Sequence, residues 1–244
     1  MNQPDNSRPD RWLAVSTSGP IWSVYLGPRS GEGGTQVELQ APRGHARDLL
    51  GAIEDLLTRA QIAFGDLAGV AVDSGPGSFT SLRMGLATVR ALAWACNRPL
   101  AAATSLAALA AEASAGRPTD PVFSLVPARR GWWYVGCGTG AHVAEQAVVA
   151  DADLPHWVRQ RGHAQALAAG SWPESLGAEL GLRACATDAQ PKARWLLACM
   201  GEPGPALAVM PAYLAASEAE IAKGWTAPDL ALEAVDRCIP TRSV

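Results

Sequence analysis

The sequence predicts an α/β fold built from two successive groups of strands and helices. Short apolar runs of strand type occur in residues 12–39 and again in residues 122–149, and helical patterns follow each group. Between them, a glycine turn joins one apolar run to a long apolar helix, an order typical of sheets covered by helices. With 244 residues, of which 48% are hydrophobic, the chain is large enough for two lobes of about 100 residues each.

Three antiparallel strands are expected to open the fold. The apolar runs Trp12 to Val15 and Ile21 to Leu26 flank a polar turn, Ser16 to Pro20, which is the pattern of a hairpin. A Gly, Pro and Ser-rich stretch then leads to a third strand, Thr35 to Leu39. A fourth strand, Leu67 to Val72, ends at Asp73 and Ser74 just before the glycine turn.

Two helices in this first half carry the apolar residues of most interest. The first, Gly44 to Ile62, is amphipathic, whereas the second, Ser81 to Cys96, is apolar around most of its circumference. A helix of the second kind has to be covered on more than one side, either by its own chain or by a second protein. As a candidate partner interface we identify seven apolar side chains on the two helices: Leu49, Ile53, Leu56, Leu82, Leu86, Val89 and Ala93.

The glycine turn is the most specific motif in the sequence. Two glycines, Gly75 and Gly77, flank one proline, and Ser78 or Thr80 is placed to cap the helix that carries Arg83. Amide groups at such a helix start bind nucleotide phosphates in some proteins, so a nucleotide or anion contact is one interpretation. The alternative is that the glycines only let the chain turn, because the motif is neither a P-loop nor a dinucleotide fingerprint.

The second half repeats the order of strands followed by helices. After a strand at Pro99 to Ala103, Thr104 or Ser105 is expected to cap an alanine-rich helix that runs through Ala115. Further strands are predicted at Val122 to Val126, Trp132 to Cys137 and His142 to Val149, helices at Leu154 to Arg161 and Ala189 to Met200, a strand at Ala206 to Val209, and a short helix within Asp229 to Val244.

These elements divide the chain into four predicted parts. They are a disordered leader (1–11), a lobe that carries the partner-binding helices (12–104), a smaller second lobe (105–215) and a C-terminal tail (216–244) that packs back on the first lobe.

Composition narrows the function classes. The net charge of −3 provides no overall positive field for nucleic acid. Five widely spaced cysteines without a CxxC pair indicate reduced thiols and a cytoplasmic protein, and no run is long and apolar enough for a membrane span. The four histidines form no HExxH motif and Ser78 lies outside a GxSxG motif, so we expect neither a metal site nor a catalytic nucleophile.

The motifs together resemble the TsaB (YeaZ-like) family of bacterial tRNA threonylcarbamoyladenosine biosynthesis. The segment GPGSFTSLRMG, starting at Gly75, is similar to the family's GPGSFTGxRxG turn and helix, and PLAAATSLAAL is similar to its next strand and helix start. Weaker similarities are WLAVSTS, GHARDLL, PARRGWWYV and MPAYLAA, so the resemblance spans roughly residues 12 to 215.

The resemblance implies a two-lobe actin-like (ASKHA) fold in which each lobe has an RNase H-like mixed sheet. It further implies an inactive paralogue of the catalytic subunit TsaD, without that subunit's metal-binding histidines. Such a protein binds TsaD through its two N-terminal helices, and the ATPase TsaE joins the complex. The tRNA is contacted only indirectly, and no cofactor is expected except ATP or ADP at the interface with a partner.

Four departures from the family pattern bear on the cleft between the lobes. Ser16 and Pro127 stand where the family has Asp, Ser81 replaces a glycine, and Asp73 stands where a small residue is usual. Two other functions remain open. One is an actin-like nucleotide-binding ATPase or phosphotransferase, which needs a metal-holding carboxylate that Ser16 does not provide; the other is a homodimeric structural protein that pairs through the same helices.

Overall fold

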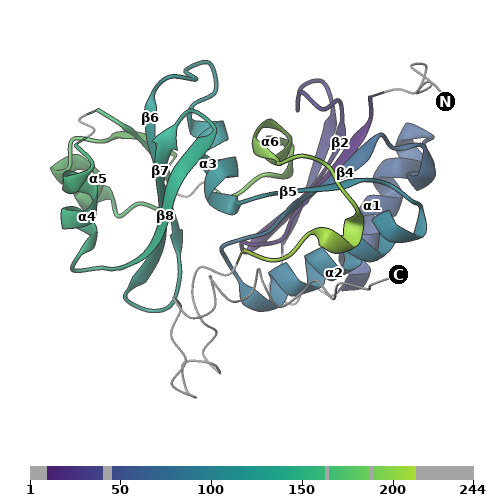
Figure 1. Cartoon of the computed structure of the whole chain (residues 1–244), viewed down its shortest axis with the longest axis horizontal. Coiled ribbons are helices and arrows are strands. Elements are labelled where there is room, and N and C mark those ends of the chain that lie inside the picture. The colour runs from purple at the N-terminus through teal and green to yellow at the C-terminus, as the bar shows by residue number, and fades with distance from the viewer. Residues whose placement is uncertain (1–9, 41–45, 163–164, 187–189, 213–244) are drawn as a thin grey trace, which may run out of the picture.

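Two five-stranded sheets, each with helices packed against it, form the two halves of the molecule (Figure 1). The computed structural model describes residues 10–40, 46–162, 165–186 and 190–212. The expected leader, the start of the first helix with His45, and the C-terminal tail with its predicted helix lie largely or wholly outside these residues.

The first sheet has the strand order β3-β2-β1-β4-β5. Its first three strands are antiparallel, whereas β4 pairs in parallel with both β1 and β5. Three antiparallel strands that continue into two parallel ones are the RNase H-like arrangement expected from the resemblance. The bounds are β1 Trp12–Ser16, β2 Ile21–Gly27, β3 Thr35–Gln40, β4 Gly69–Asp73 and β5 Leu100–Ala103.

Helices cover both faces of this sheet. Leu13 and Val15 of β1 face the core shared with α1 (Ala46–Ala60) and α2 (Phe79–Ala95), whereas Trp12 and Ala14 face α6 (Ala193–Cys199). Alternate side chains of a strand point to opposite faces, which is why β1 is buried along its whole length. The helix α6 comes from the range assigned to the second lobe, so the chain returns to the first sheet after building the second.

The second sheet has the order β10-β9-β6-β7-β8, with β6, β7 and β8 antiparallel and β9 and β10 parallel to β6. Two helices, α4 and α5, lie on one face, and α3 lies between the two sheets (Figure 1). The bounds are α3 Ser105–Ala113, β6 Pro121–Pro127, β7 Trp132–Thr139, β8 His142–Ala150, α4 Leu154–Gln160, β9 Leu167–Gly170, α5 Glu174–Glu179 and β10 Arg183–Ala186. The sequence did not predict β9, α5 or β10.

The structure confirms the α/β class and corrects several elements. The segment expected as a strand at Ala206 to Val209 forms a 3-10 helix, η2 (Ala206–Ala208), and a second such turn, η1, spans Phe64–Asp66. The second helix starts at Phe79, two residues before the predicted start, and α6 starts only at Ala193. Among the described residues, no helix has the length and hydrophobicity needed to cross a membrane.

Candidate functional site

A buried carboxylate, that of Asp73, lies at the end of β4 and is only 1% exposed. Its Oδ2 accepts hydrogen bonds from the hydroxyls of Ser16 (2.7 Å) and Ser18 (2.5 Å). Its Oδ1 accepts from the Ser105 hydroxyl (2.7 Å) and the Gly75 amide (2.8 Å). One side chain therefore ties together the end of β1, the glycine turn and the start of α3.

Burial raises the pKa of Asp73, and the four hydrogen bonds oppose that rise. An ionised carboxylate has about four lone-pair positions, and protein donors already occupy four. Two of the departures from the family pattern, Ser16 and Asp73, are therefore linked, because the Ser16 hydroxyl on β1 donates a hydrogen bond to the Asp73 carboxylate on β4. Asp73 is an internal structural tie and is not displayed as a ligand in the cleft.

The glycine turn fastens α2 to the segment that follows β1. Gly75 has a φ of +100°, which favours glycine, and a Cβ on Gly77 would lie 2.5 Å from the Ser18 carbonyl oxygen. The Ser78 amide donates to that same oxygen (2.8 Å). Because the Gly75 and Ser78 amides already have protein acceptors, the turn loses two of the donors that a phosphate would need.

The expected capping of α2 is wrong in its details. Ser78 occupies the N-cap position but makes no capping hydrogen bond; its hydroxyl instead donates to the Ser81 hydroxyl (3.1 Å). Thr80 lies within the first turn of the helix. The Thr17 hydroxyl donates to the Ser81 carbonyl (3.0 Å), and the start of α2 is therefore held by the turn after β1.

The candidate partner interface predicted from sequence is also wrong, because its side chains belong to the core of the first lobe. They lie on the faces of α1 and α2 that pack against the sheet, and none exceeds 4% exposure. The spacing of the apolar residues identified the faces of α1 and α2 that pack against the sheet, and these faces are covered within the protein's own core. The seven residues are Leu49, Ile53, Leu56, Leu82, Leu86, Val89 and Ala93.

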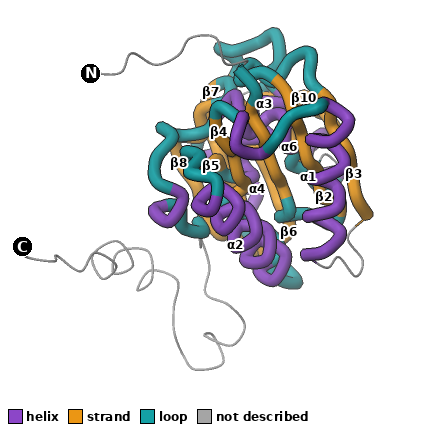
Figure 2. Tube along the Cα trace, turned by 90° about the vertical axis from the view of Figure 1, so that its right-hand side faces the viewer, coloured by secondary structure: helices purple, strands orange, loops and turns teal. Residues whose placement is uncertain are grey.

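Another side of α2 carries exposed side chains. Trp94 is 67% exposed, Phe79 is at the helix start with 36% exposed, and Arg83 stacks 3.8 Å from the Phe79 ring centroid. Between them Ala87 and Ala91 are exposed, and α2 carries no acidic residue. We call Phe79, Arg83, Ala87, Ala91 and Trp94 the outer face of α2. Figures 1 and 2 place this helix at the margin of the first lobe.

From the sequence, Trp94 falls outside the apolar row of Leu82, Leu86, Val89 and Ala93, but that row was the one selected as the candidate interface. The helical spacing already indicated the row that contains Trp94, since Ala91 follows Ala87 by four residues and Trp94 follows Ala91 by three. That row lies opposite the row of Leu86, Val89 and Ala93. Trp94, a large aromatic side chain outside the buried row, was the better candidate for a partner interface.

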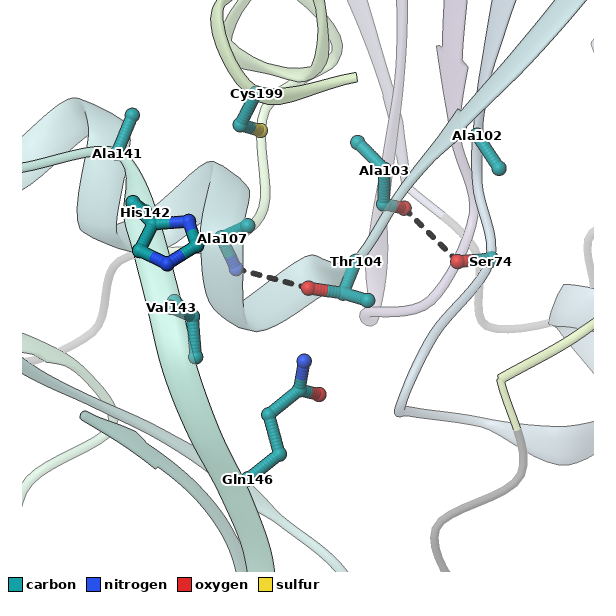
Figure 3. Close-up of a pocket in the computed structure, with 10 residues that line it drawn as sticks. All are labelled: Ser74, Ala102, Ala103, Thr104, Ala107, Ala141, His142, Val143, Gln146 and Cys199. Carbon is teal, nitrogen blue, oxygen red and sulfur yellow. Dashed lines mark hydrogen bonds between the residues drawn. The ribbon is translucent and has the colours of Figure 1, made fainter. Parts of the chain in front are cut away.

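A cavity of about 220 Å³ lies between the two halves, where the ends of β4 and β5 and the start of α3 face β8 (Figure 3). Two of its polar groups are bonded within the chain: the Ser74 hydroxyl donates to the Ala103 carbonyl (3.1 Å), and the Thr104 hydroxyl accepts from the Ala107 amide (3.2 Å). The lining contains no Asp, Glu, Lys or Arg: it consists of Ser74, Ala102, Ala103, Thr104, Ala107, Ala141, His142, Val143, Gln146 and Cys199.

The electrostatics of this cavity do not suit a metal-bound polyphosphate. At its edge, burial and then the negative charge of Asp73 raise the pKa of Cys199 to about 12, so the thiol stays protonated. Within the described part of the chain, no three His, Cys, Asp or Glu side chains are close enough to hold a metal ion. His163, like His45, lies outside that part.

Comparison with known proteins identifies the family to which the sequence is similar. The model of the family described as TsaD, tRNA N6-adenosine threonylcarbamoyltransferase, matches residues 32–156, just over half of the chain. The chain is 29% identical to the tRNA threonylcarbamoyladenosine biosynthesis protein TsaB of Escherichia coli over 181 residues, which cover 70% of this chain and 77% of that protein. It is 37% identical to the Bacillus subtilis TsaB over 95 residues, which cover 38% of this chain and 40% of that protein.

A solved structure is similar over most of the chain. YeaZ from Pseudomonas aeruginosa aligns with a TM-score of 0.67 and 28% sequence identity, and the alignment covers 84% of this chain and all of that one. The two-lobe fold is therefore shared along the whole length of a known protein.

Proposed function

The chain belongs to the TsaD family, in which it is similar to the TsaB/YeaZ proteins, and from that premise we propose that it is a non-catalytic subunit of the tRNA threonylcarbamoyladenosine modification complex. In this role it binds and supports a TsaD-like catalytic subunit in the cytoplasm. A TsaE-like ATPase joins through the complex, and the tRNA is contacted by the partners.

The observation that carries the proposal is the outer face of α2. It combines two exposed aromatic rings with small side chains that let another helix approach closely. The glycine turn most similar to the family motif positions this same helix. An exposed apolar surface of this kind is more economically explained by a partner than by chance exposure of single residues.

The lack of catalysis is proposed from the sequence and the cleft together. The chain has no catalytic motif recognised above, and the lining of the described cavity has no Asp, Glu, Lys or Arg side chain. We propose no cofactor within this chain, with ATP or ADP confined to the interface with the partner. The internal use of Asp73 supports this, because its carboxylate is already satisfied by protein donors.

Gene replacement tests the function directly. A strain depleted of its own TsaB is supplied with this chain, and threonylcarbamoyladenosine in its tRNA is measured by mass spectrometry of nucleosides. We expect the native chain to restore the modified nucleoside, and Trp94→Glu to restore much less at equal protein level. No restoration by the native chain would contradict the proposed function.

Self-association through the outer face of α2 is a second candidate, favoured by the 67% exposure of Trp94. Without the catalytic subunit, two copies that pair through this surface would remove it from water. Light scattering with and without the partner separates the two. A dimer that persists in the presence of the partner would favour the structural role.

A further inference from the structure

Both halves of the molecule contribute walls to the inter-lobe cavity. The segments at the ends of β4 and β5 provide Ser74, Ala103 and Thr104, and β8 provides His142 and Gln146 (Figure 3). The cavity volume of about 220 Å³ is several times the share of one water molecule in the liquid, about 30 Å³. A small organic molecule held there would contact both lobes at once.

Gln146 brings an unpaired carboxamide to this cavity. Figure 3 shows its amide group directed from β8 toward the side of Thr104 and Ser74. Its Oε1 is buried and has no hydrogen-bond partner among the residues that the structure describes. An unpaired buried acceptor destabilises a fold and is rare in folded proteins, so its presence at the cavity indicates a partner from outside the chain.

The strand register explains why the fold leaves this amide unpaired. Gln146 lies beside Gly136 of β7, which has no side chain to offer a hydrogen bond. On the far side of Gly136, Ser124 of β6 is 1% exposed, and its hydroxyl also has no partner in the described part of the chain. A Cβ on Gly136 would lie 2.9 Å from the Ser124 Oγ, so a larger residue would crowd that hydroxyl. Because Ser124 is not part of the cavity lining, Gln146 is the member of this row that a ligand meets.

The rest of the lining favours an uncharged ligand. A charged molecule would lose its hydration without gaining an ion pair, because the lining has no Asp, Glu, Lys or Arg. The Thr104 hydroxyl accepts from the Ala107 amide and keeps its proton as a donor, whereas the Ser74 oxygen can still accept. The remaining walls are mostly small and apolar, which suits a compact or flat apolar body: Ala102, Ala103, Ala107, Ala141 and Val143.

We propose that the cavity binds a small uncharged molecule that carries an amide group, either a carboxamide or a ring amide. The ligand N–H donates to Gln146 Oε1, and the ligand carbonyl accepts from Gln146 Nε2 or from the Thr104 hydroxyl. The torsion next to a glutamine amide has a broad energy profile, so the amide turns readily to present both of its groups. The apolar part of the ligand lies against the alanines, and the bound molecule links the two lobes. This binding site is separate from the proposed role as a subunit.

Two matched probes test the site in the full-length chain without any partner. Benzamide and acetophenone share a ring and a carbonyl, but acetophenone has a methyl group where benzamide has its N–H donors. Each is titrated while backbone amide signals of the lining residues are followed by NMR. We expect benzamide to shift these signals and to bind about tenfold more tightly than acetophenone, which leaves Gln146 Oε1 unpaired. Gln146→Leu should abolish this preference, whereas Gln160→Leu, the same substitution at an exposed position of α4, should preserve it.

Equal affinities of the native chain for the two probes, or no shift at the lining residues, would overturn the proposal. Thermal melting without a probe adds an independent readout. Gln146→Leu removes an unpaired buried oxygen, so this variant should melt at or above the temperature of the native chain. A variant that melts several degrees lower would also overturn the proposal, because the amide would then be bonded within the fold. None of these results bears on the binding of a catalytic subunit, since none is present.

Discussion

At the residue scale, Asp73 determines how the segments around the cleft are joined. Its carboxylate receives hydrogen bonds from the segment after β1, from the glycine turn and from the start of α3. These segments are distant in sequence, and this one side chain forms hydrogen bonds with all three. The hydroxyls of Ser16, Ser18 and Ser105 depend on it in turn, because they are buried.

Replacing Asp73 with alanine should destabilise the fold strongly. Asp73→Ala leaves three buried hydroxyls and one amide without their acceptor, and we expect a loss of about 2–4 kcal/mol in the free energy of unfolding. Asp73→Asn keeps one carbonyl oxygen and should lose less. Urea unfolding measures both, and an alanine variant as stable as the native chain would show that the cluster does not stabilise the fold.

Asp73 also predicts a pH dependence. Its pKa is raised in the folded protein because of burial, so the folded state binds the proton more tightly than the unfolded chain. This contribution to stability is complete below the ordinary pKa of aspartate and is lost as pH rises through the raised value.

The measurement compares native and Asp73→Asn proteins by urea unfolding from acidic to neutral pH. The stability of the native chain relative to the variant should fall as pH rises and then become constant. A relative stability that instead increases with pH would mean that the four hydrogen bonds outweigh burial and lower the pKa of Asp73.

At the element scale, the two sides of α2 have separate roles. The row with Leu86 and Val89 packs in the core, whereas the row with Ala87 and Ala91 lies at the surface. Substitutions at nearby positions of this helix should therefore affect the stability of the fold and the association with a partner separately. The prediction from sequence selected as the interface the row that packs in the core.

A matched pair of acidic substitutions tests the two sides. Val89→Asp buries an uncompensated charge and should cost about 3–5 kcal/mol of stability. Ala91→Glu faces solvent and should change stability by less than about 0.5 kcal/mol. Thermal melting checks both, and a destabilised Ala91→Glu variant would mean that residue 91 is covered by the folded lobe.

The sequence allowed some elements to be predicted and not others, for physical reasons. The β1–β2 hairpin and α2 were predictable because their apolar runs and turn residues have clear periods. The strand β9, with the sequence LAAG, has no such period, and its burial is decided by contacts with β6. The Asp73 cluster was equally hidden, since it depends on strand register and not on spacing along the chain.

At the scale of the whole molecule, the lobes meet through α3, α6 and a cavity whose lining has no Asp, Glu, Lys or Arg. Lys192 of the segment before α6 pairs with Glu112 of α3 (2.6 Å), so the returning chain is linked to the helix between the sheets. The lining of the cavity contains no Lys or Arg side chain. The inter-lobe region is accordingly suited to holding the lobes together.

Calorimetry with ATP and Mg²⁺ tests the cleft of the isolated chain. The described lining provides neither a Lys or Arg side chain for the phosphates nor a carboxylate for the metal, so we expect no binding in the micromolar range. Asp73 is already fully hydrogen-bonded. Micromolar binding to the pure protein would instead favour the actin-like ATPase or phosphotransferase.

The affinity of the purified TsaD-like subunit for surface variants of this chain tests the central claim most directly. Ala91→Glu lies on the outer face of α2, and Thr139→Glu, the matched control, is an exposed position on the second sheet. We predict that Ala91→Glu weakens binding at least about tenfold, because it places a charge in an apolar contact. The control should bind like the native chain. Unchanged binding by the folded Ala91→Glu variant would contradict the account.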